Sequence, residues 1–186
     1  MDIQKMLERV KGILLKPEQE WGKIKTEQTT NKELILYYVL PFAAVAALIS
    51  LIVVWSNTYL GFGLVLRFAV LQLVLPIIAV IVAAVVINEL AETFNSEKDL
   101  NNAFKLVAYA YTPALLVSII TSISWTLSFL GLLGLYGVYL LWVGLPVMMK
   151  TPEDKRLVYI IAAVVVILLV NVIISALFSI GRVGYY

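Results

Sequence analysis

The residues of this sequence that could do chemistry are few, and the clearest candidates are two glutamates. Glu89 and Glu92 lie three positions apart, so on a helix their carboxylates would share a face and could act as an acid–base pair or bind a hard cation. The sequence has no cysteine and no histidine, which excludes thiolate and imidazole metal sites and every histidine-dependent triad. A membrane-embedded hydrolase using this pair is one hypothesis; with so few reactive groups, we expect no enzyme.

The segment that follows, FNSEKDLNN, has oxygen-bearing side chains at alternate positions from Asn95 to Asn101. An EF-hand needs glycine at its sixth position and glutamate at its twelfth, whereas counting from Asn95 places leucine at both. A solvated turn in which Ser96 or Asp99 caps the next helix explains the segment better. No glycine pattern follows a strand or precedes Lys-Ser/Thr, so nucleotide-binding loops are not indicated. We expect no cofactor and no metal.

Polar side chains inside the apolar part of the sequence are a third candidate. No ionisable residue lies near the middle of an apolar segment, which argues against ion-coupled transport. The polar residues there could line a passive path, as in a channel, permease or lipid scramblase, or could form hydrogen bonds between helices. They are Gln72, Thr112, Ser118, Thr121, Ser122 and Asn171.

Composition identifies the environment in which these residues must be positioned. Of the 186 residues, 62% are hydrophobic and 14% are charged, whereas soluble domains have about 45–50% and about 25%. The chain is therefore predicted to be an all-α integral membrane protein. Net charge is +2 and the sequence has no long basic run, so no nucleic-acid partner is expected.

Five apolar segments have lengths near the ~20 residues that a helix needs to cross a bilayer. They lie at about 34–55, 67–90, 104–124, 127–149 and 157–180, and they define a transmembrane bundle over residues 34–186. The third is the most polar, and it begins near Lys105. Helices are expected because every backbone polar group must be satisfied within the bilayer.

The distribution of Lys and Arg predicts the orientation. Basic residues gather before the first span, between the second and third, and between the fourth and fifth, whereas the opposite face has only Arg67 at a span edge and Arg182 in the tail. We therefore expect a cell-membrane protein with a cytoplasmic N-terminus and an external C-terminus. The first 33 residues lack an early apolar run, so no cleavable signal peptide is predicted.

Residues 1–33 are predicted to form cytoplasmic amphipathic helices lying at the membrane interface. Apolar residues recur at helical spacing from Ile3 to Leu14, and Pro17 is placed to open a second helix with Trp21 as an interfacial anchor. A dedicated partner-docking surface is the alternative. Thr30 and Glu33 have the spacing of a capping box at the start of the first span.

The fourth span, with the sequence YGVYLLWVGLPVMM in its second half, combines small and aromatic residues. Gly134, Gly137 and Gly144 fall on one helix face with Gly131 nearby, and this face would allow a neighbouring helix to approach closely. A groove for a lipid or small ligand is the alternative. Flanking this face we place Tyr136, Tyr139 and Trp142, with Pro146 breaking the helix near the inner interface.

Three blocks, LLKPEQEWGKIKTE, NAFKLVAYAYTPALL and LGLYGVYLLWVGLPVMMKTPEDK, resemble the signature regions of the Yip family, the Ypt/Rab-interacting membrane proteins. The resemblance spans nearly the whole chain and implies a five-span fold with a cytoplasmic N-terminus. Eukaryotic relatives are associated with Rab-type GTPases and vesicle traffic; this chain has a shorter N-terminal region and is more similar to the prokaryotic branch. The matching residues, our candidate partner, lipid or packing motif, are Pro17, Trp21, Lys105, Tyr109, Thr112, Pro113, Gly134, Tyr136, Gly137, Tyr139, Trp142, Gly144, Pro146, Pro152 and Lys155.

A chain rich in packing residues and poor in reactive groups favours a non-catalytic membrane organiser or adaptor, in the Yip manner, with a role in membrane trafficking or homeostasis. Its expected partners are the lipid bilayer and a membrane or cytoplasmic protein. A glycine face exposed on the fourth span would also suit a homo-oligomer.

Overall fold

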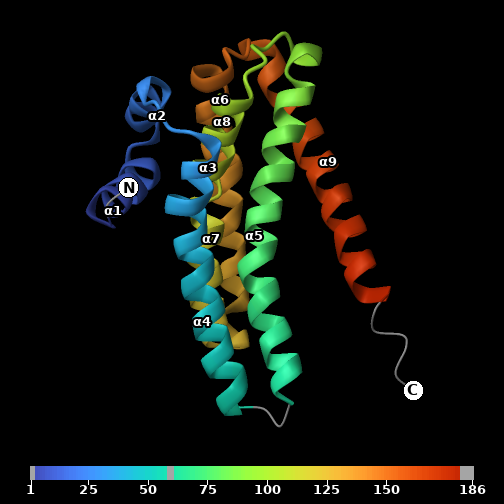
Figure 1. The fold of residues 1–186 in the computed structure, drawn as a ribbon. Coiled ribbons are helices and arrows are strands. Elements are labelled where there is room, and N and C mark those ends of the chain that lie inside the picture. Colours follow the sequence, from blue (N-terminus) through green and yellow to red (C-terminus); the bar gives the residue numbers. More distant parts are fainter. Residues whose placement is uncertain (1–2, 58–60, 181–186) are drawn as a thin grey trace.

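The computed structural model describes residues 3–57 and 61–180, and over these ranges every regular element is helical (Figure 1). The α-helices are α1 (Ile3–Leu15), α2 (Pro17–Thr26), α3 (Asn31–Leu34), α4 (Leu40–Asn57), α5 (Phe62–Leu90), α6 (Leu100–Ala110), α7 (Thr112–Ile123), α8 (Tyr136–Met149) and α9 (Glu153–Ile180). A π-helical turn, η1 (Ile35–Val39), joins α3 to α4, and 3₁₀ segments form η2 (Glu92–Phe94) and η3 (Trp125–Leu135).

Four continuous helical runs among the described residues are long and apolar enough to cross a membrane. They are Asn31–Ser56, Phe62–Leu90, Leu100–Ile123 and Thr126–Met149. Each of the first four predicted segments therefore lies in a helix that is long and apolar enough to cross a membrane. The helix α5 begins at Phe62, before the predicted start near residue 67, so Arg67 lies inside the helix. The helix α9 covers the fifth predicted range, but its crossing of the membrane stays a prediction, and Arg182 lies outside the described residues.

The central element of the bundle is the third run, α6–α7. Half of the residues in its most apolar 18-residue stretch are buried inside the protein, against 22–28% in the corresponding stretches of the other three runs. Its mean hydropathy of 1.8 equals that of the fourth run and is well below the 3.0 of α5. Polar and small side chains concentrate there because this run faces other helices and not lipid. The most polar predicted span is thus the one around which α4, α5 and α8 pack.

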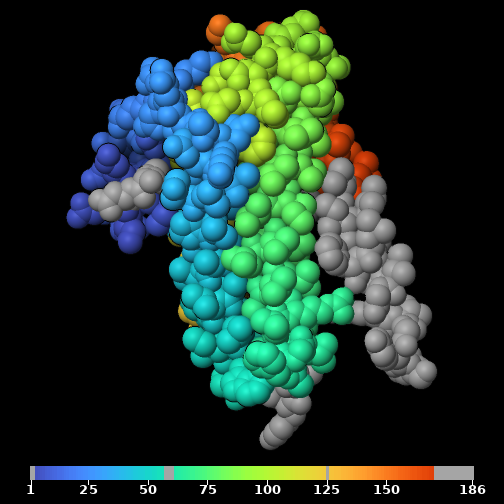
Figure 2. Space-filling model, in the orientation of Figure 1, coloured from blue at the N-terminus to red at the C-terminus, as the bar shows by residue number. Residues whose placement is uncertain are grey.

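The N-terminal helices α1 and α2, which we call the cap, lie against one end of this bundle. Figure 2 shows the cap as a lobe beside the start of the first span. The predicted capping box is confirmed, because the Thr30 hydroxyl accepts from the Glu33 amide and the Glu33 carboxylate accepts from the Thr30 amide. Asp99 caps α6 in the same way by accepting from the Asn102 amide at 3.0 Å.

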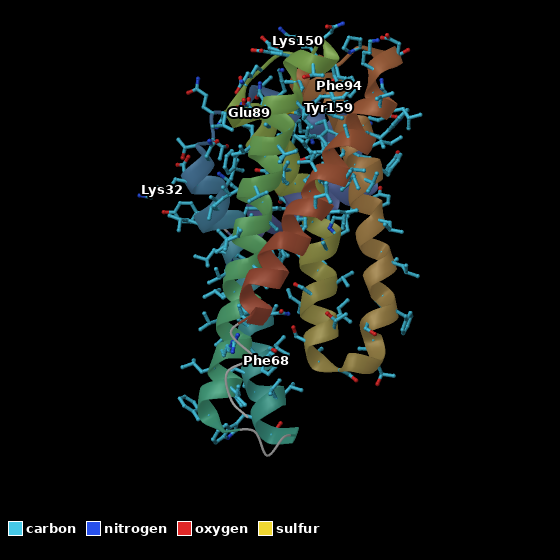
Figure 3. All side chains as sticks on the ribbon, turned by 90° about the vertical axis from the view of Figure 1, so that its right-hand side faces the viewer. Lys32, Phe68, Glu89, Phe94, Lys150 and Tyr159 are labelled. Atoms are coloured by element: carbon cyan, nitrogen blue, oxygen red, sulfur yellow. The ribbon has the colours of Figure 1, made fainter. Side chains whose placement is uncertain are left out.

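The connections 91–99 and 150–152 lie at the same end as the cap, which we call the basic end. The amide of Glu97 donates to the carbonyl of Met149 at 2.7 Å, and Lys150 forms an ion pair with Glu97 at 3.0 Å. Figure 3 shows Lys150 at this end of the bundle, above Phe94 and Tyr159. Those two rings stack with centroids 4.8 Å apart and hold α9 against the end of α5.

The fourth span differs from the single α-helix that we predicted. Its first half is the 3₁₀ segment η3, in which residues three apart share a face, and Gly134 lines one pocket together with Gly137. A Cβ atom at Gly134 would be in ordinary contact with Ala114, and one at Gly131 would meet no described atom within 4 Å. The close approach is made by Gly137 and Gly144. Both are covered by this chain itself, which leaves no open seam at these two positions for a second copy.

Gly137 is the glycine at which a side chain should be tolerated least. A Cβ atom there would lie 2.7 Å from the Ala110 carbonyl oxygen, a backbone atom that cannot move without displacing α6. We predict that Gly137→Ala lowers the free energy of unfolding by about 1–3 kcal/mol. Thermal unfolding in detergent measures the change, with Gly131→Ala as the matched control. Equal melting temperatures for the two variants would contradict the close-packing interpretation.

Candidate functional site

The site begins at a break in the central run, where α6 ends and α7 begins. Pro113 has no amide hydrogen, so it cannot bond to the carbonyl of Tyr109, four residues earlier. The hydroxyl of Thr112 donates to that carbonyl at 2.6 Å in its place. The Thr-Pro pair therefore interrupts the helix between α6 and α7 without leaving the buried Tyr109 carbonyl unsatisfied, as a membrane interior requires.

Tyr38, in the π turn η1, lies directly opposite this break. Its hydroxyl is 2.6 Å from the hydroxyl of Thr112. Because the single hydroxyl hydrogen of Thr112 is used on Tyr109, Tyr38 donates and Thr112 accepts. The rings of Tyr38 and Tyr109 meet edge to face with centroids 4.7 Å apart. Two irregular helix segments are thus joined through one polar contact in a buried setting.

Arg9 of α1 covers this contact from the side of the cap. Its guanidinium lies over the Tyr109 ring, 5.5 Å from the centroid, and forms ion pairs with Glu20 and Glu27. The side chains of Arg9 and Glu20 are only 11% and 9% exposed, so this is a buried charge cluster and not a surface pair. We call Arg9, Glu20, Glu27 and Tyr109 the Arg9 cluster. Gly12 leaves room for it, since a Cβ there would lie 2.5 Å from the Glu20 carboxyl carbon.

Three hydrogen bonds from side chains to backbone carbonyls tie the cap to the bundle. Lys105 donates to the carbonyl of Glu27 at 2.5 Å, and Lys25 donates to that of Met148 at 2.8 Å. The Tyr136 hydroxyl donates to the carbonyl of Leu14 at 2.9 Å. Met148 and Leu14 lie in the last turns of their helices, where carbonyls lack partners within the helix. Lys105 is therefore not a loop residue that reaches solvent; it is 4% exposed.

Trp21 was predicted to anchor the cap in the membrane interface, and this prediction was wrong. Its side chain is fully buried and lies against α8 at Gly144. A Cβ at Gly144 would lie 2.7 Å from Trp21 Cε2 and 2.5 Å from Leu106 Cδ1. The missing side chain makes a notch for an indole from another helix. Pro17, the first residue of α2, is buried beside it at the start of the same helix.

A polar cleft of about 650 Å³ lies between the cap, the start of the first span and α6. Basic and acidic side chains are equally represented in its lining, and Tyr37, Tyr38 and Tyr109 form its aromatic part. Most of the acids are already engaged: Glu20 and Glu27 by Arg9, and Glu33 by Thr30. Carboxylates held in this way are suited to fixing the position of the cap.

Of the predicted pair Glu89 and Glu92, Glu89 is engaged by neighbouring side chains. Glu89 accepts from Lys98 at 2.8 Å and from Asn88 at 3.0 Å, and its side chain is 60% exposed. The hydrogen bond to Glu89 raises the pKa of Lys98 and keeps it charged. Among the described residues, no group of three His, Cys, Asp or Glu side chains could hold a metal ion.

The predicted motif residues separate into three groups in space. Trp21, Lys105, Tyr109, Thr112 and Gly144 converge where the cap meets the bundle, together with Pro17, Pro113, Tyr136 and Gly137. Tyr139, Trp142 and Pro146 do not flank the glycine face; they line a separate cleft on another side of α8. Pro152 and Lys155 form the turn into α9, with the Lys155 amide donating to the Pro152 carbonyl at 3.2 Å. Gly134 faces Ala114 of α7 and lines one pocket with Gly137.

Sequence reasoning missed Arg9, Glu20, Tyr38 and Arg156. One signal was available, because the sequence has arginine rather than lysine at only four positions, and Arg9 and Arg156 are two of them. Arginine is the basic residue suited to buried pairs and to stacking on aromatic rings. Both of these arginines do lie over aromatic rings, Arg9 over Tyr109 and Arg156 over Trp142.

Comparison with known proteins agrees with this arrangement. No curated protein and no solved structure matches the chain. The model of one family, described as the Yip1 domain, matches residues 11–174, a range that begins in α1 after Arg9 and ends in α9. It contains the three hydrogen bonds that tie the cap to the bundle, but not Arg9. The chain is therefore a multi-pass membrane protein that belongs to the Yip1 domain family.

Proposed function

We propose that this protein is a non-catalytic membrane organiser, in which the bundle holds the cap at the bilayer surface so that the cap can bind a membrane or cytoplasmic protein. The observation that carries the proposal is the Arg9 cluster. A largely buried arginine between two carboxylates fixes α1 on α2 and on Tyr109. Lys23, which pairs with Glu20 at 3.0 Å, balances the second negative charge, and this arrangement is suited to holding helices and not to proton transfer.

The outer surface of α1 is the part of the cap that supports partner binding. Val10 and Ile13 are buried against α2 and the bundle, whereas Ile3, Leu7 and Leu15 are 69%, 49% and 77% exposed. Only part of the apolar stripe of α1 is thus buried within the chain. An apolar surface bordered by lysines, as this one is by Lys5 and Lys11, suits a protein partner at the membrane surface.

The orientation that we propose has five spans, with the cap and the basic end in the cytoplasm and the C-terminus outside. It is supported by the gathering of basic segments at one end of the bundle and by the length of α9. Lys16 and Lys23 of the cap and Lys98 and Lys150 of the connections all belong to this end.

A second candidate function is a passive path for lipid or a small neutral solute. It is favoured by a groove of about 740 Å³ between α4, α5, α7 and η3, lined by Gln72 and hydroxyl side chains. The hydroxyls of Ser118, Thr121 and Ser122 donate to carbonyls of their own helix, and Gln72 donates to Ser122 at 2.9 Å. Asn171, the remaining sequence candidate for such a path, has a side chain outside the described residues.

The orientation can be tested with single cysteines, since the natural sequence has none. We predict that Lys11→Cys is protected from an impermeant thiol reagent in intact cells and that Gly184→Cys is labelled. Both should react after permeabilisation. Labelling of residue 11 and protection of residue 184 would reverse the orientation, whereas protection of both would place the two termini on one side.

The adaptor proposal can be tested by releasing the cap. Arg9→Gln leaves the buried Glu20 without its guanidinium, and removing one partner of a buried pair costs roughly 3–5 kcal/mol. We predict faster hydrogen exchange throughout α1 and loss of the protein crosslinks made by a photoreactive residue at position 7. Lys32→Gln removes the same charge from an exposed position outside the cap and should change neither. The proposal fails if the photoreactive residue at position 7 crosslinks only to lipid in the protein that keeps Arg9.

The passive path can be tested in liposomes that contain the purified protein. If the groove conducts, labelled lipid or solute should cross faster than in empty vesicles, and Thr121→Val should slow the transfer by removing a hydroxyl from the lining without changing side-chain shape. No transfer above that of empty vesicles would eliminate this candidate and leave the organiser proposal intact.

A further inference from the structure

Arg156, in the first turn of α9, has an unusual setting for a basic residue next to a loop. Its side chain is only 16% exposed, and its guanidinium lies over the Trp142 ring, 4.9 Å from the centroid. Its ion pair with Glu153 is long, at 3.5 Å, and joins it to a carboxylate that is 93% exposed. An exposed pair of this kind contributes little, so it does not account for the burial of the arginine.

The Nε atom of Arg156 is buried and has no hydrogen-bond acceptor among the described residues. A guanidinium has five N–H donors in a fixed plane, and a buried donor without a partner has an energetic cost. Stacking on Trp142 stabilises the cation but supplies no acceptor. The position therefore fits an anion that is brought by a ligand.

The side chain of Arg156 opens onto a cleft of about 310 Å³ between α2, α8 and α9. The polar and aromatic part of the lining consists of Arg156, Glu18, Tyr139 and Trp142, and the apolar part includes Val143 and Val147. The cleft therefore combines one cation, one carboxylate from the cap and two half-exposed aromatic rings.

The cleft lies at the boundary between the charged turn into α9 and the exposed apolar stretch of that helix. Leu157, Val158 and Ile161, which follow Arg156, are 53–56% exposed, as expected for side chains in contact with acyl chains. Tyr139 and Trp142 are the residue types that concentrate at the level of lipid headgroups. A ligand that enters here comes from the bilayer surface.

We propose that this cleft binds the headgroup of an aminophospholipid of the phosphatidylethanolamine type. The phosphate accepts hydrogen bonds from Arg156, and the ammonium group is attracted to the carboxylate of Glu18 and to the aromatic faces. The acyl chains then run along the exposed side of α9. Glu18 disfavours a headgroup with net negative charge, and a trimethylammonium group cannot donate hydrogen bonds to it. The proposal does not depend on the organiser role.

The test is native mass spectrometry of the full-length protein in detergent, titrated with short-chain phosphatidylethanolamine, phosphatidylglycerol and phosphatidylcholine. We expect phosphatidylethanolamine to bind about tenfold tighter than either of the others. Arg156→Gln should weaken the binding of all three by about tenfold or more, and Arg156→Lys should restore only part of it, because an ammonium lacks the planar donor set. Glu18→Gln should remove the preference for phosphatidylethanolamine mainly by strengthening binding of phosphatidylglycerol.

Lys155→Gln is the matched control, because Lys155 is the neighbouring basic residue and pairs only with Asp154, at 3.6 Å, among the described residues. It should leave all three affinities unchanged, and unchanged melting temperatures should show that every variant is folded. The proposal is overturned if Lys155→Gln weakens binding as much as Arg156→Gln, if the three lipids bind equally, or if millimolar inorganic phosphate displaces the lipid, which would indicate a site for free phosphate.

Discussion

The arrangement of this protein depends on how closely the backbone of α8 approaches α6 and α2. Within a bilayer the tails of lipids are as apolar as leucine side chains, so helices gain little by hiding apolar surface from water. Association must come from dispersion contacts between closely packed surfaces and from hydrogen bonds. Gly137 allows the backbone of α8 to reach the Ala110 carbonyl, and Gly144 admits the Trp21 ring. The same helix therefore packs against the central run and receives the cap.

Packing the cap against the bundle buries charged side chains, which has an energetic cost. Arg9 lies in a largely buried setting, where an isolated cation would be costly. Two carboxylates and the face of Tyr109 surround it, and the Thr112 hydroxyl satisfies the carbonyl that Pro113 cannot. Each of these groups needs the others to be in place. The cap and the central run are thus positioned by one connected polar network, whose members come from segments far apart in the sequence.

Local patterns in the sequence were sufficient to predict much of the fold. The four helical runs that are long and apolar enough to cross a membrane follow from apolar length, and the capping box at Thr30 and the Asp99 cap follow from residue spacing. Contacts between distant segments were not predictable in this way. A tryptophan in an amphipathic helix looks the same whether it faces lipid or fills a notch, so the location of Trp21 depends on Gly144, which is more than one hundred residues away.

The sequence identified several residues of the site, but it did not indicate how they contact one another. Tyr109, Thr112 and Lys105 were identified from the family resemblance. Tyr109 contacts Arg9 of the cap and Lys105 bonds to Glu27 just after it, whereas Thr112 bonds to Tyr38 of η1. Arg9 and Tyr38 were missed because neither spacing nor composition indicates which arginine is buried or which tyrosine faces a helix break. The 3₁₀ form of η3 was also missed, because an apolar, glycine-containing run has the same hydropathy in either helical form.

The mixed composition of the fourth span now has a physical explanation. Successive residues of an α-helix are rotated by about 100°, so Tyr139 and Trp142 lie on roughly the opposite side from Gly137 and Gly144. The glycine side is filled by α6 and α2 of the same chain. The aromatic side remains half exposed beside Arg156 and Glu18. Because the glycine side of α8 is already packed against α6 and α2, any ligand or second molecule that binds at α8 has to contact the aromatic side.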